Sequence, residues 1–201
     1  MEAPPVPETL TLPKLREAVQ QCRACELYKG TTQAVLGEGP ARAKAMLVGE
    51  QPGDREDREG HPFVGPAGAL LDRALQEAGI ERGDVYITNV VKHFRFRARG
   101  KRRIHQRPDR EHVQACRPWL DAELAIVKPH VLVCMGAVAA QGLLGSKVRV
   151  TRDRGTPIES ELADWVTVTV HPSSILRAGD ERQAAYEAFV RDLETVAGLL
   201  K

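Results

Sequence analysis

Short apolar runs alternate with longer amphipathic segments along most of this chain. Four runs rich in aliphatic residues predict buried strands, at residues 45–49, 84–88, 130–135 and 164–170. Around them, apolar residues recur at helical spacing in 12–21, 65–79, 109–127, the segment from Gly136 to about Gly145, and a final helix through Ala185 and Leu200. Strands that alternate with helices are typical of a mainly parallel sheet. We therefore predict a three-layer α/β/α fold around a mainly parallel four-stranded sheet.

The composition is that of an ordinary folded domain. With 201 residues, 42% hydrophobic and 28% charged, the chain is long enough to bury one sizeable core. We expect a single domain over residues 11–201, after a flexible, proline-rich lead-in at 1–10. No apolar run approaches the roughly 20 residues that a membrane span requires. The first residues lack the pattern of a secretory signal, so we expect a cytoplasmic protein with reduced thiols, and nothing demands more than a monomer.

Positive charge is concentrated in one stretch. The net charge is only +2, but residues 92–110 hold nine of the 29 Lys and Arg residues against one acid, Asp109. The same stretch contains Phe94 and Phe96. A basic patch with aromatic residues fits a nucleic-acid backbone better than a membrane surface. A solvated charged loop is the alternative, and the charge run alone does not separate the two.

Polar segments follow three of the four predicted strands. In parallel sheets, ligands bind beyond the carboxyl ends of the strands. The segments at those ends are GEQPG at 49–53, residues 89–93, Gly136, and HPSS at 171–174. All except Gly136 carry side chains capable of chemistry, so we expect one shared cleft at this edge.

The four cysteines allow several interpretations. Cys22 and Cys25 form a C-x-x-C pair, whereas Cys116 and Cys134 are 18 positions apart. A thioredoxin-like pair is disfavoured because no βαβ unit surrounds it, and zinc knots usually take two close pairs. Four unequally spaced thiolates are compatible with an iron–sulfur cluster. The alternative is that Cys134 is a buried strand thiol and Cys116 a helix-face residue.

Five motifs in order resemble one family, the iron–sulfur uracil-DNA glycosylases of the family 4 type. They are the C-x-x-C pair, GEQPG, HPFVGPAG with Phe63, TNVVKH at 88–93, and HPSS. The resemblance covers nearly the whole chain and implies a uracil-DNA glycosylase fold, excision of uracil from DNA, and a 4Fe-4S cluster. In this interpretation the cluster ligands are Cys22, Cys25, Cys116 and Cys134.

One departure from the ordinary family pattern is informative. Ordinary members continue from TNVVK into a Cys-Arg-Pro-Pro-like turn, whereas here Lys92 leads into HFRFRARGKRRIHQRP. The inserted KRRIH at 101–105 resembles the UdgX subgroup, whose members become covalently attached to uracil-containing DNA through the histidine of that motif. The resemblance thus implies that His105 is a nucleophile.

The residue types suit this chemistry. Cleavage of a glycosidic bond builds positive charge on the sugar and negative charge on the departing base. Glu50 is the candidate to stabilise the sugar, and His171 is the candidate donor to uracil. Asn89 suits the edge of the extruded base, and Phe63 its face. The predicted pocket is Gly49, Gln51, Asp54, Phe63 and Asn89, with Asp54 orienting Glu50 or water.

The basic motif suggests two kinds of role. A neutral His105 imidazole can attack the anomeric carbon, and the substituted imidazole is a poor leaving group. Lys101, Arg102 and Arg103 are expected to contact phosphates or to hold the loop. Three other interpretations remain open: a multiple-turnover glycosylase, a non-catalytic iron–sulfur protein that binds nucleic acid, and a zinc-stabilised fold.

Overall fold

A central five-stranded sheet organises the molecule. The computed structural model describes residues 4–201. The strand order is β2 (Val85–Asn89), β1 (Ala45–Gly49), β5 (Val131–Met135), β7 (Ala163–Thr169) and β6 (Ile158–Ser160). The first four strands run parallel to one another, and β6 pairs antiparallel with β7. The predicted α/β class with a mainly parallel sheet is confirmed, but the predicted number of four strands is wrong by one.

The fifth strand left no hydrophobic pattern in the sequence. β6 has only three residues, Ile158, Glu159 and Ser160, and none of them is buried. An edge strand of this kind forms through backbone hydrogen bonds to its neighbour rather than through apolar burial. The pattern of apolar and polar residues therefore could not predict this strand.

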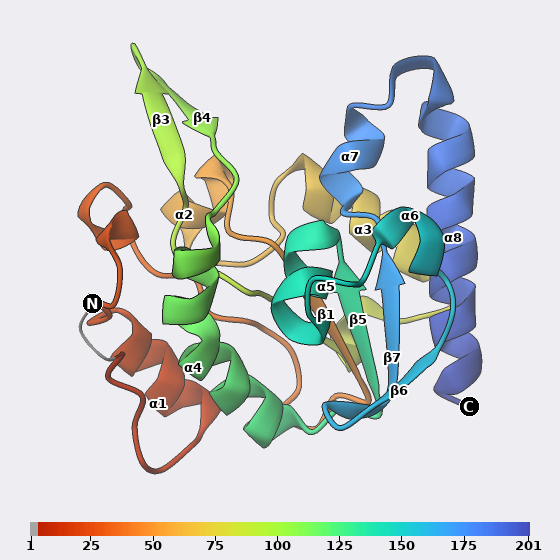
Figure 1. Ribbon diagram of the computed structural model, residues 1–201, viewed down its shortest axis with the longest axis horizontal. Coiled ribbons are helices and arrows are strands. Elements are labelled where there is room, and N and C mark those ends of the chain that lie inside the picture. Colours follow the sequence, from red (N-terminus) through yellow and green to blue (C-terminus); the bar gives the residue numbers. More distant parts are fainter. Residues whose placement is uncertain (1–3) are drawn as a thin grey trace.

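Alternate residues of each strand face two different helix layers. Leu47 and Val133 pack with α3 (Pro66–Glu77) and α8 (Arg182–Leu199), whereas Met46 and Leu132 pack on the side of α4 (Arg110–Val127) and α5 (Ala137–Leu144). This is the two-residue period of a strand covered on both faces. A further layer, α1 (Leu12–Val19), packs on α4 (Figure 1). The predicted three layers are confirmed.

The predicted helix boundaries hold to within a few residues. The Thr11 hydroxyl accepts the Lys14 N–H at the start of α1, and Lys128 ends α4 in the left-handed conformation, directly before Pro129. The short elements that periodicity did not predict are α2 (Asp54–Glu59), α6 (Val150–Asp153), α7 (Pro172–Leu176), and the 3₁₀ turns Glu26–Lys29, Arg82–Asp84 and Gly179–Glu181.

The basic stretch forms a hairpin instead of an irregular loop. β3 (Phe96–Arg99) and β4 (Arg102–His105) pair antiparallel, with Phe96 opposite His105. The hairpin projects away from the sheet, on the same side as α7 (Figure 1). It is separate from the central sheet, so its orientation depends on side-chain contacts at its base.

The lead-in contains one packed residue. Residues 4–10 form no helix or strand, and Val6 packs against the cluster around Leu15 and Trp119. Residues 1–3 of the predicted flexible segment lie outside the described residues. Within residues 4–201, no helix has both the length and the apolar character needed to cross a membrane.

Candidate active site

A cleft of about 720 Å³ opens at the carboxyl ends of the parallel strands. Side chains from loops far apart in the sequence line it. They include six predicted site residues: Glu50, Gln51, Phe63, Asn89, His105 and His171. These side chains therefore meet at one edge of the sheet, as predicted from the positions of the strand ends.

Phe63 lies in the cleft because two glycines make room for it. A Cβ atom on Gly49 would lie 2.6 Å from the Phe63 ring and 2.5 Å from the Asn89 carboxamide oxygen. A Cβ on Gly68 would lie 1.7 Å from the Phe63 carbonyl oxygen. Phe63 itself has a φ of 56°, a conformation that costs a non-glycine residue on the order of 1–3 kcal/mol. Gly49, predicted as a pocket residue, is not among the residues that line the cleft, and instead leaves room for the side chains of Phe63 and Asn89. The strained backbone of Phe63 lies at the cleft.

Asn89 and Glu50 each present a buried oxygen without a hydrogen-bond partner among residues 4–201. These atoms are the Asn89 Oδ1, in a side chain that is 2% exposed, and the Glu50 Oε1. An unsatisfied buried acceptor is costly and rare in folded proteins. Both atoms belong to cleft residues, so a donor on a bound molecule can satisfy them.

Glu50 is a partly buried carboxylate. Burial raises its pKa, while the nearby charges of Arg107 and Arg177 lower it and so partly offset the burial. Its Oε1 lies 3.4 Å from the His105 Nε2. The carboxylate thus faces the imidazole across a gap that is longer than a normal hydrogen bond.

The side-chain amide of Gln51 fixes the position of His105. The Gln51 Nε2 contacts the His105 Nε2 at 2.8 Å and donates to the Gln106 carbonyl at 2.9 Å. The Gln51 Oε1 accepts the Arg95 N–H at 2.9 Å. The Gln51 Nε2 also donates to the Arg95 carbonyl at 3.2 Å. Because an amide nitrogen does not accept, a hydrogen bond between the two side chains has the His105 Nε2 as acceptor and the proton on Nδ1. Burial, and then the charge of Arg177, lowers the pKa of His105.

His171 is held as a neutral donor. It caps α7, and its Nδ1 accepts the Ser173 N–H at 3.2 Å, so that Nε2 carries the proton. Burial lowers the pKa of His171 to about 4, with smaller effects from His105 and Arg177. Its ring centroid lies 5.8 Å from that of Phe63. A neutral imidazole N–H beside an aromatic face is the arrangement predicted for base recognition.

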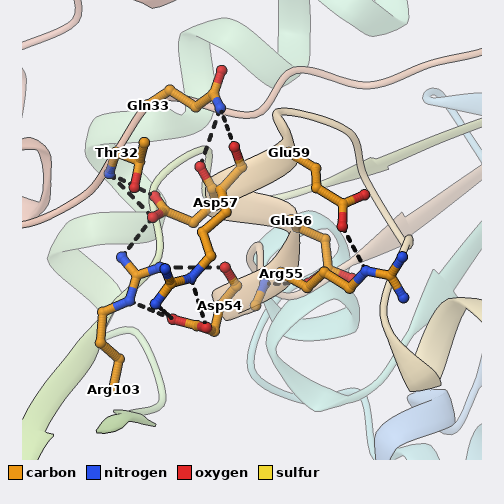
Figure 2. Close-up of polar contacts among 10 residues, drawn as sticks. Thr32, Gln33, Asp54, Arg55, Glu56, Asp57, Glu59 and Arg103 are labelled. Carbon is orange, nitrogen blue, oxygen red and sulfur yellow. Dashed lines mark hydrogen bonds and ion pairs between the residues drawn. The ribbon is translucent and has the colours of Figure 1, made fainter. Parts of the chain in front are cut away.

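The hairpin is attached to α2 through Arg103 (Figure 2). Its guanidinium forms an ion pair with the Asp54 carboxylate and a second one with Asp57, at 2.6 Å from Nη1 to Oδ2. It also lies over the rings of Phe94 and Phe96, at 5.5 and 5.1 Å from their centroids. Of the two roles predicted for Arg103, the structure favours holding the loop.

The buried end of this attachment is Asp57. The side chain is fully buried and accepts the Thr32 N–H at 3.0 and 3.1 Å, in addition to its bond with Arg103. Asp54, in turn, binds Arg58 and Arg103 and does not line the cleft. The prediction that Asp54 orients Glu50 or water is therefore wrong, because its carboxylate is occupied outside the cleft. Lys101 and Arg102 are exposed on the hairpin.

A second carboxylate missed by sequence reasoning joins two loops of the cleft. Glu56 accepts the Gly53 N–H at 3.1 Å and the Gly65 N–H at 2.8 Å. These bonds tie the loop after β1 to the start of α3. The acidic sequence of α2 gave no sign that this carboxylate turns inward.

Three of the four cysteines lie close together. Cys22, Cys25 and Cys116 are each at most 8% exposed. Burial raises the pKa of Cys116 to about 12, and the charges of Cys25 and Cys22 contribute to that rise. The Cys22 Sγ accepts the Trp119 Nε1–H at 3.2 Å, which fixes the N-terminal segment on α4.

Cys134 belongs to the same hydrophobic cluster as Cys116 but lies within the central sheet. It lies in β5, paired with Val48 on one side and Val168 on the other, and burial alone raises its pKa to about 12. Cys134 is thus a buried strand thiol, and its place in the predicted set of four ligands stays a prediction. Within residues 4–201, no three His, Cys, Asp or Glu side chains are arranged around a single metal position.

His93 is the polar residue that the sequence reasoning left unassigned. It is 3% exposed, and burial lowers its pKa to about 4, with contributions from Asp57 and from Arg23, which stands between Cys22 and Cys25. The preceding residue, Lys92, donates its backbone N–H to the Cys116 Sγ at 3.5 Å. A signal was present in the sequence, because His93 occupies the position of the cysteine in the ordinary Cys-Arg-Pro-Pro-like turn.

Comparison with known proteins agrees with this arrangement. Residues 36–194 match the family described as the uracil DNA glycosylase superfamily. A Type-4 uracil-DNA glycosylase of Thermotoga maritima is 43% identical over 162 residues, which cover 80% of this chain and 81% of that protein. Another of that name, from Pyrobaculum aerophilum, is 37% identical over 196 residues, or 94% of each chain. The chain therefore belongs to the uracil DNA glycosylase superfamily.

Proposed function

We propose that this protein excises uracil from DNA and becomes covalently linked to the resulting deoxyribose through His105. The observation that carries the proposal is the position of the His105 Nε2 lone pair, in the same cleft as Glu50, Asn89 and His171. The similarity to Type-4 uracil-DNA glycosylases supports the excision step. The covalent step rests on the geometry of His105 and on the KRRIH resemblance.

Recognition of uracil is assigned to three side chains. The unpartnered Asn89 carboxamide oxygen accepts the N3–H of the base, and Phe63 stacks on its face. The His171 Nε2–H donates to a uracil carbonyl. Extrusion of a base costs a few kcal/mol, which these contacts offset. The strained Phe63 and the two small glycines beneath it keep this surface ready before DNA binds.

Cleavage transfers the electron pair of the C1′–N1 bond to uracil. The Glu50 carboxylate stabilises the cationic sugar, and the neutral His171 N–H stabilises the anionic base. The His105 Nε2 leaves its hydrogen bond with the Gln51 amide, and its lone pair then forms the new bond to C1′. The resulting imidazolium loses its Nδ1 proton to solvent, which reaches this half-exposed side chain. The neutral N-substituted imidazole is a poor leaving group, so the adduct persists.

The thiol group is assigned to a 4Fe-4S cluster. Cys22, Cys25 and Cys116 fit three of its ligand positions, and the buried His93 imidazole fits the fourth. In a cluster of this type each ligand binds a different iron, so the ligands need not surround one point. When bound, the cluster crosslinks the N-terminal segment, α4 and the base of the hairpin.

Iron content and visible absorption of purified variants test this ligand set. We expect Cys134→Ala to keep the brown colour and the iron of the parent protein, and Cys116→Ala to lose both. His93→Cys should retain the iron, because it restores a thiolate at the same place. Loss of iron in Cys134→Ala, with full iron in Cys116→Ala, would contradict the assignment.

A denaturing gel tests the proposed reaction. The protein is mixed with a single-stranded oligonucleotide that carries one uracil, and we expect a slow, heat-stable protein–DNA band. His105→Ala should remove the band. His130→Ala is the matched control, because His130 pairs with Asp164 at the opposite end of the sheet and should leave the band unchanged.

The other outcomes separate the alternatives. Alkali-sensitive free DNA at many turnovers, without a band, would identify an ordinary hydrolytic glycosylase. Unchanged DNA would identify a protein that only binds nucleic acid. A band that survives in His105→Ala would show that another residue is the nucleophile.

A further inference from the structure

A second concave surface continues from the cleft along the groove between α4 and α5. This groove has a volume of about 590 Å³. It shares Arg107 and Val138 with the cleft, so the two surfaces are continuous across Arg107. Neither the sequence motifs nor the proposed reaction gives this groove a role.

The groove is lined by cations and contains no acidic residue. Its arginines are Arg107, Arg110 and Arg117. Among residues 4–201, the side chains of Arg107 and Arg110 form no ion pair. Arg117 pairs with Asp121 at 2.6 Å and donates to the Gly142 carbonyl at 3.1 Å, which joins the two helices at the floor. Two unpaired guanidinium groups beside the cleft form a site for an anion.

The floor of the groove suits a base rather than a phosphate alone. Val113 and Val138 provide apolar contact, and Gly142 allows close approach of the helices, since a Cβ there would lie 3.0 Å from Val113. Gln114 and Gln141 line the walls. Side-chain amides offer both donors and acceptors to base edges. The lining thus combines phosphate-binding and base-binding groups.

On the opposite side of the cleft, the arginines of α2 are paired with acids. There α2 carries four acids, and the one inward-facing arginine of the hairpin, Arg103, is neutralised by Asp54 and Asp57 (Figure 2). A polyanion entering the cleft therefore meets positive charge without an ion-pair partner among residues 4–201 at Arg177 within the cleft, and at Arg107 and Arg110 toward the groove.

We propose that the α4–α5 groove is a subsite for the nucleotide next to the uracil in single-stranded DNA. Arg107 and Arg110 bind its phosphates, and its base lies over Val113 and Val138 between the two glutamines. The inference rests on the proposed function, because it takes the occupant of the adjoining cleft to be the extruded nucleotide.

Binding measured without reaction tests the subsite. The probes are fluorescent oligonucleotides that contain the cleavage-resistant 2′-fluoro analogue of deoxyuridine and are extended one nucleotide at a time on either side. For the parent protein we expect a gain in affinity on one side only. Arg110→Gln should abolish that gain and weaken binding by about three- to tenfold. It should also lower the slope of log affinity against log salt by about 0.7, the value for one phosphate contact on a single strand.

Matched variants distinguish binding in the groove from a general effect of positive charge on DNA affinity. Arg191→Gln removes an exposed arginine from α8, on the far helix layer, and should not change the gain. Gln114→Ala should reduce the gain while leaving the salt slope unchanged. If Arg110→Gln weakens short and extended oligonucleotides equally, or changes neither, the groove is not a subsite.

Adduct formation and the one-sided gain in affinity report separately on the reaction and on the subsite. The adduct rate at saturating DNA should be the same in Arg191→Gln as in the parent protein. A protein that forms the adduct but shows no one-sided gain contradicts only the subsite. A protein that shows the gain without any excision or adduct retains the subsite and contradicts the reaction.

Discussion

Arg103 and Arg107 lie four positions apart in the same basic stretch, yet they face different surroundings. Arg103 has a side chain that is 15% exposed, contacts Asp54 and Asp57, and lies over two phenylalanine rings. Arg107 is exposed, lines both the cleft and the α4–α5 groove, and forms no side-chain ion pair within residues 4–201. A run of basic residues thus combines two uses: one arginine builds the hairpin, and the other remains available to DNA.

The difference follows from what a two-stranded hairpin requires. An isolated hairpin is marginally stable in water, and β3–β4 does not join the central sheet. Arg103 and the stacked Phe94 and Phe96 rings, with centroids 5.2 Å apart, attach it to the body of the protein. His105 lies at the end of this hairpin, so its distance from Glu50 depends on the attachment.

The largest expected effect comes from breaking this attachment. Arg103→Met removes both ion pairs and leaves the buried Asp57 with only its Thr32 contact. We expect the free energy of unfolding to fall by about 2 kcal/mol, and the adduct rate at saturating DNA to fall by about 100-fold, because His105 loses its position. Urea unfolding and single-turnover gels measure the two quantities.

Two variants of the same stretch sharpen that result. Arg102→Met removes an exposed charge from the same strand and should change stability by less than about 0.5 kcal/mol. Arg103→Lys should rescue the adduct rate only in part, since an ammonium group cannot make the same planar contacts. A normal adduct rate in Arg103→Met would mean that the hairpin is held by something else.

A smaller effect is expected from Arg107 on the pH dependence of the reaction. Glu50 acts ionised, and its pKa is raised by burial and lowered by Arg107 and Arg177. The adduct rate should therefore fall as the pH drops through the pKa of Glu50. Arg107→Gln removes one lowering charge, so the fall should begin at higher pH, by up to about one unit. Burial lowers the pKa of His105, which favours its neutral form.

Rates at saturating DNA across pH 4.5 to about 8 test this shift. Arg103→Met is the contrasting variant: it should lower the rate at every pH without moving the midpoint. If Arg107→Gln moves the midpoint to lower pH, or if Arg103→Met moves it as well, the assignment of Arg107 to the Glu50 side of the cleft is wrong.

The smallest effect is expected at the tip of the hairpin. Lys101 is exposed and far from the groove, so Lys101→Gln should weaken binding of a uracil-containing single strand by about twofold at most. Fluorescence anisotropy beside Arg110→Gln gives the comparison. If Lys101→Gln has the larger effect, the strand runs over the hairpin rather than into the α4–α5 groove.

The sequence by itself determined the layered fold and the contents of the cleft. Alternation of apolar runs with amphipathic segments required a parallel sheet, and the carboxyl ends of parallel strands necessarily share one edge. Glu50 and His171 follow strands and Asn89 is the last residue of one, so their convergence could be predicted. The order of the motifs also indicated the family that the comparisons show.

Only the tertiary structure decided which polar groups pair with one another. It placed the Cys134 thiol within the central sheet, bound the Asp54 carboxylate to Arg58 and Arg103, and turned Arg103 inward. These outcomes depend on how a strand, a helix and a hairpin pack across long sequence separations. The physical reason is that periodicity records whether a side chain is buried, whereas the partner of a charge or a thiol depends on what the fold places opposite it.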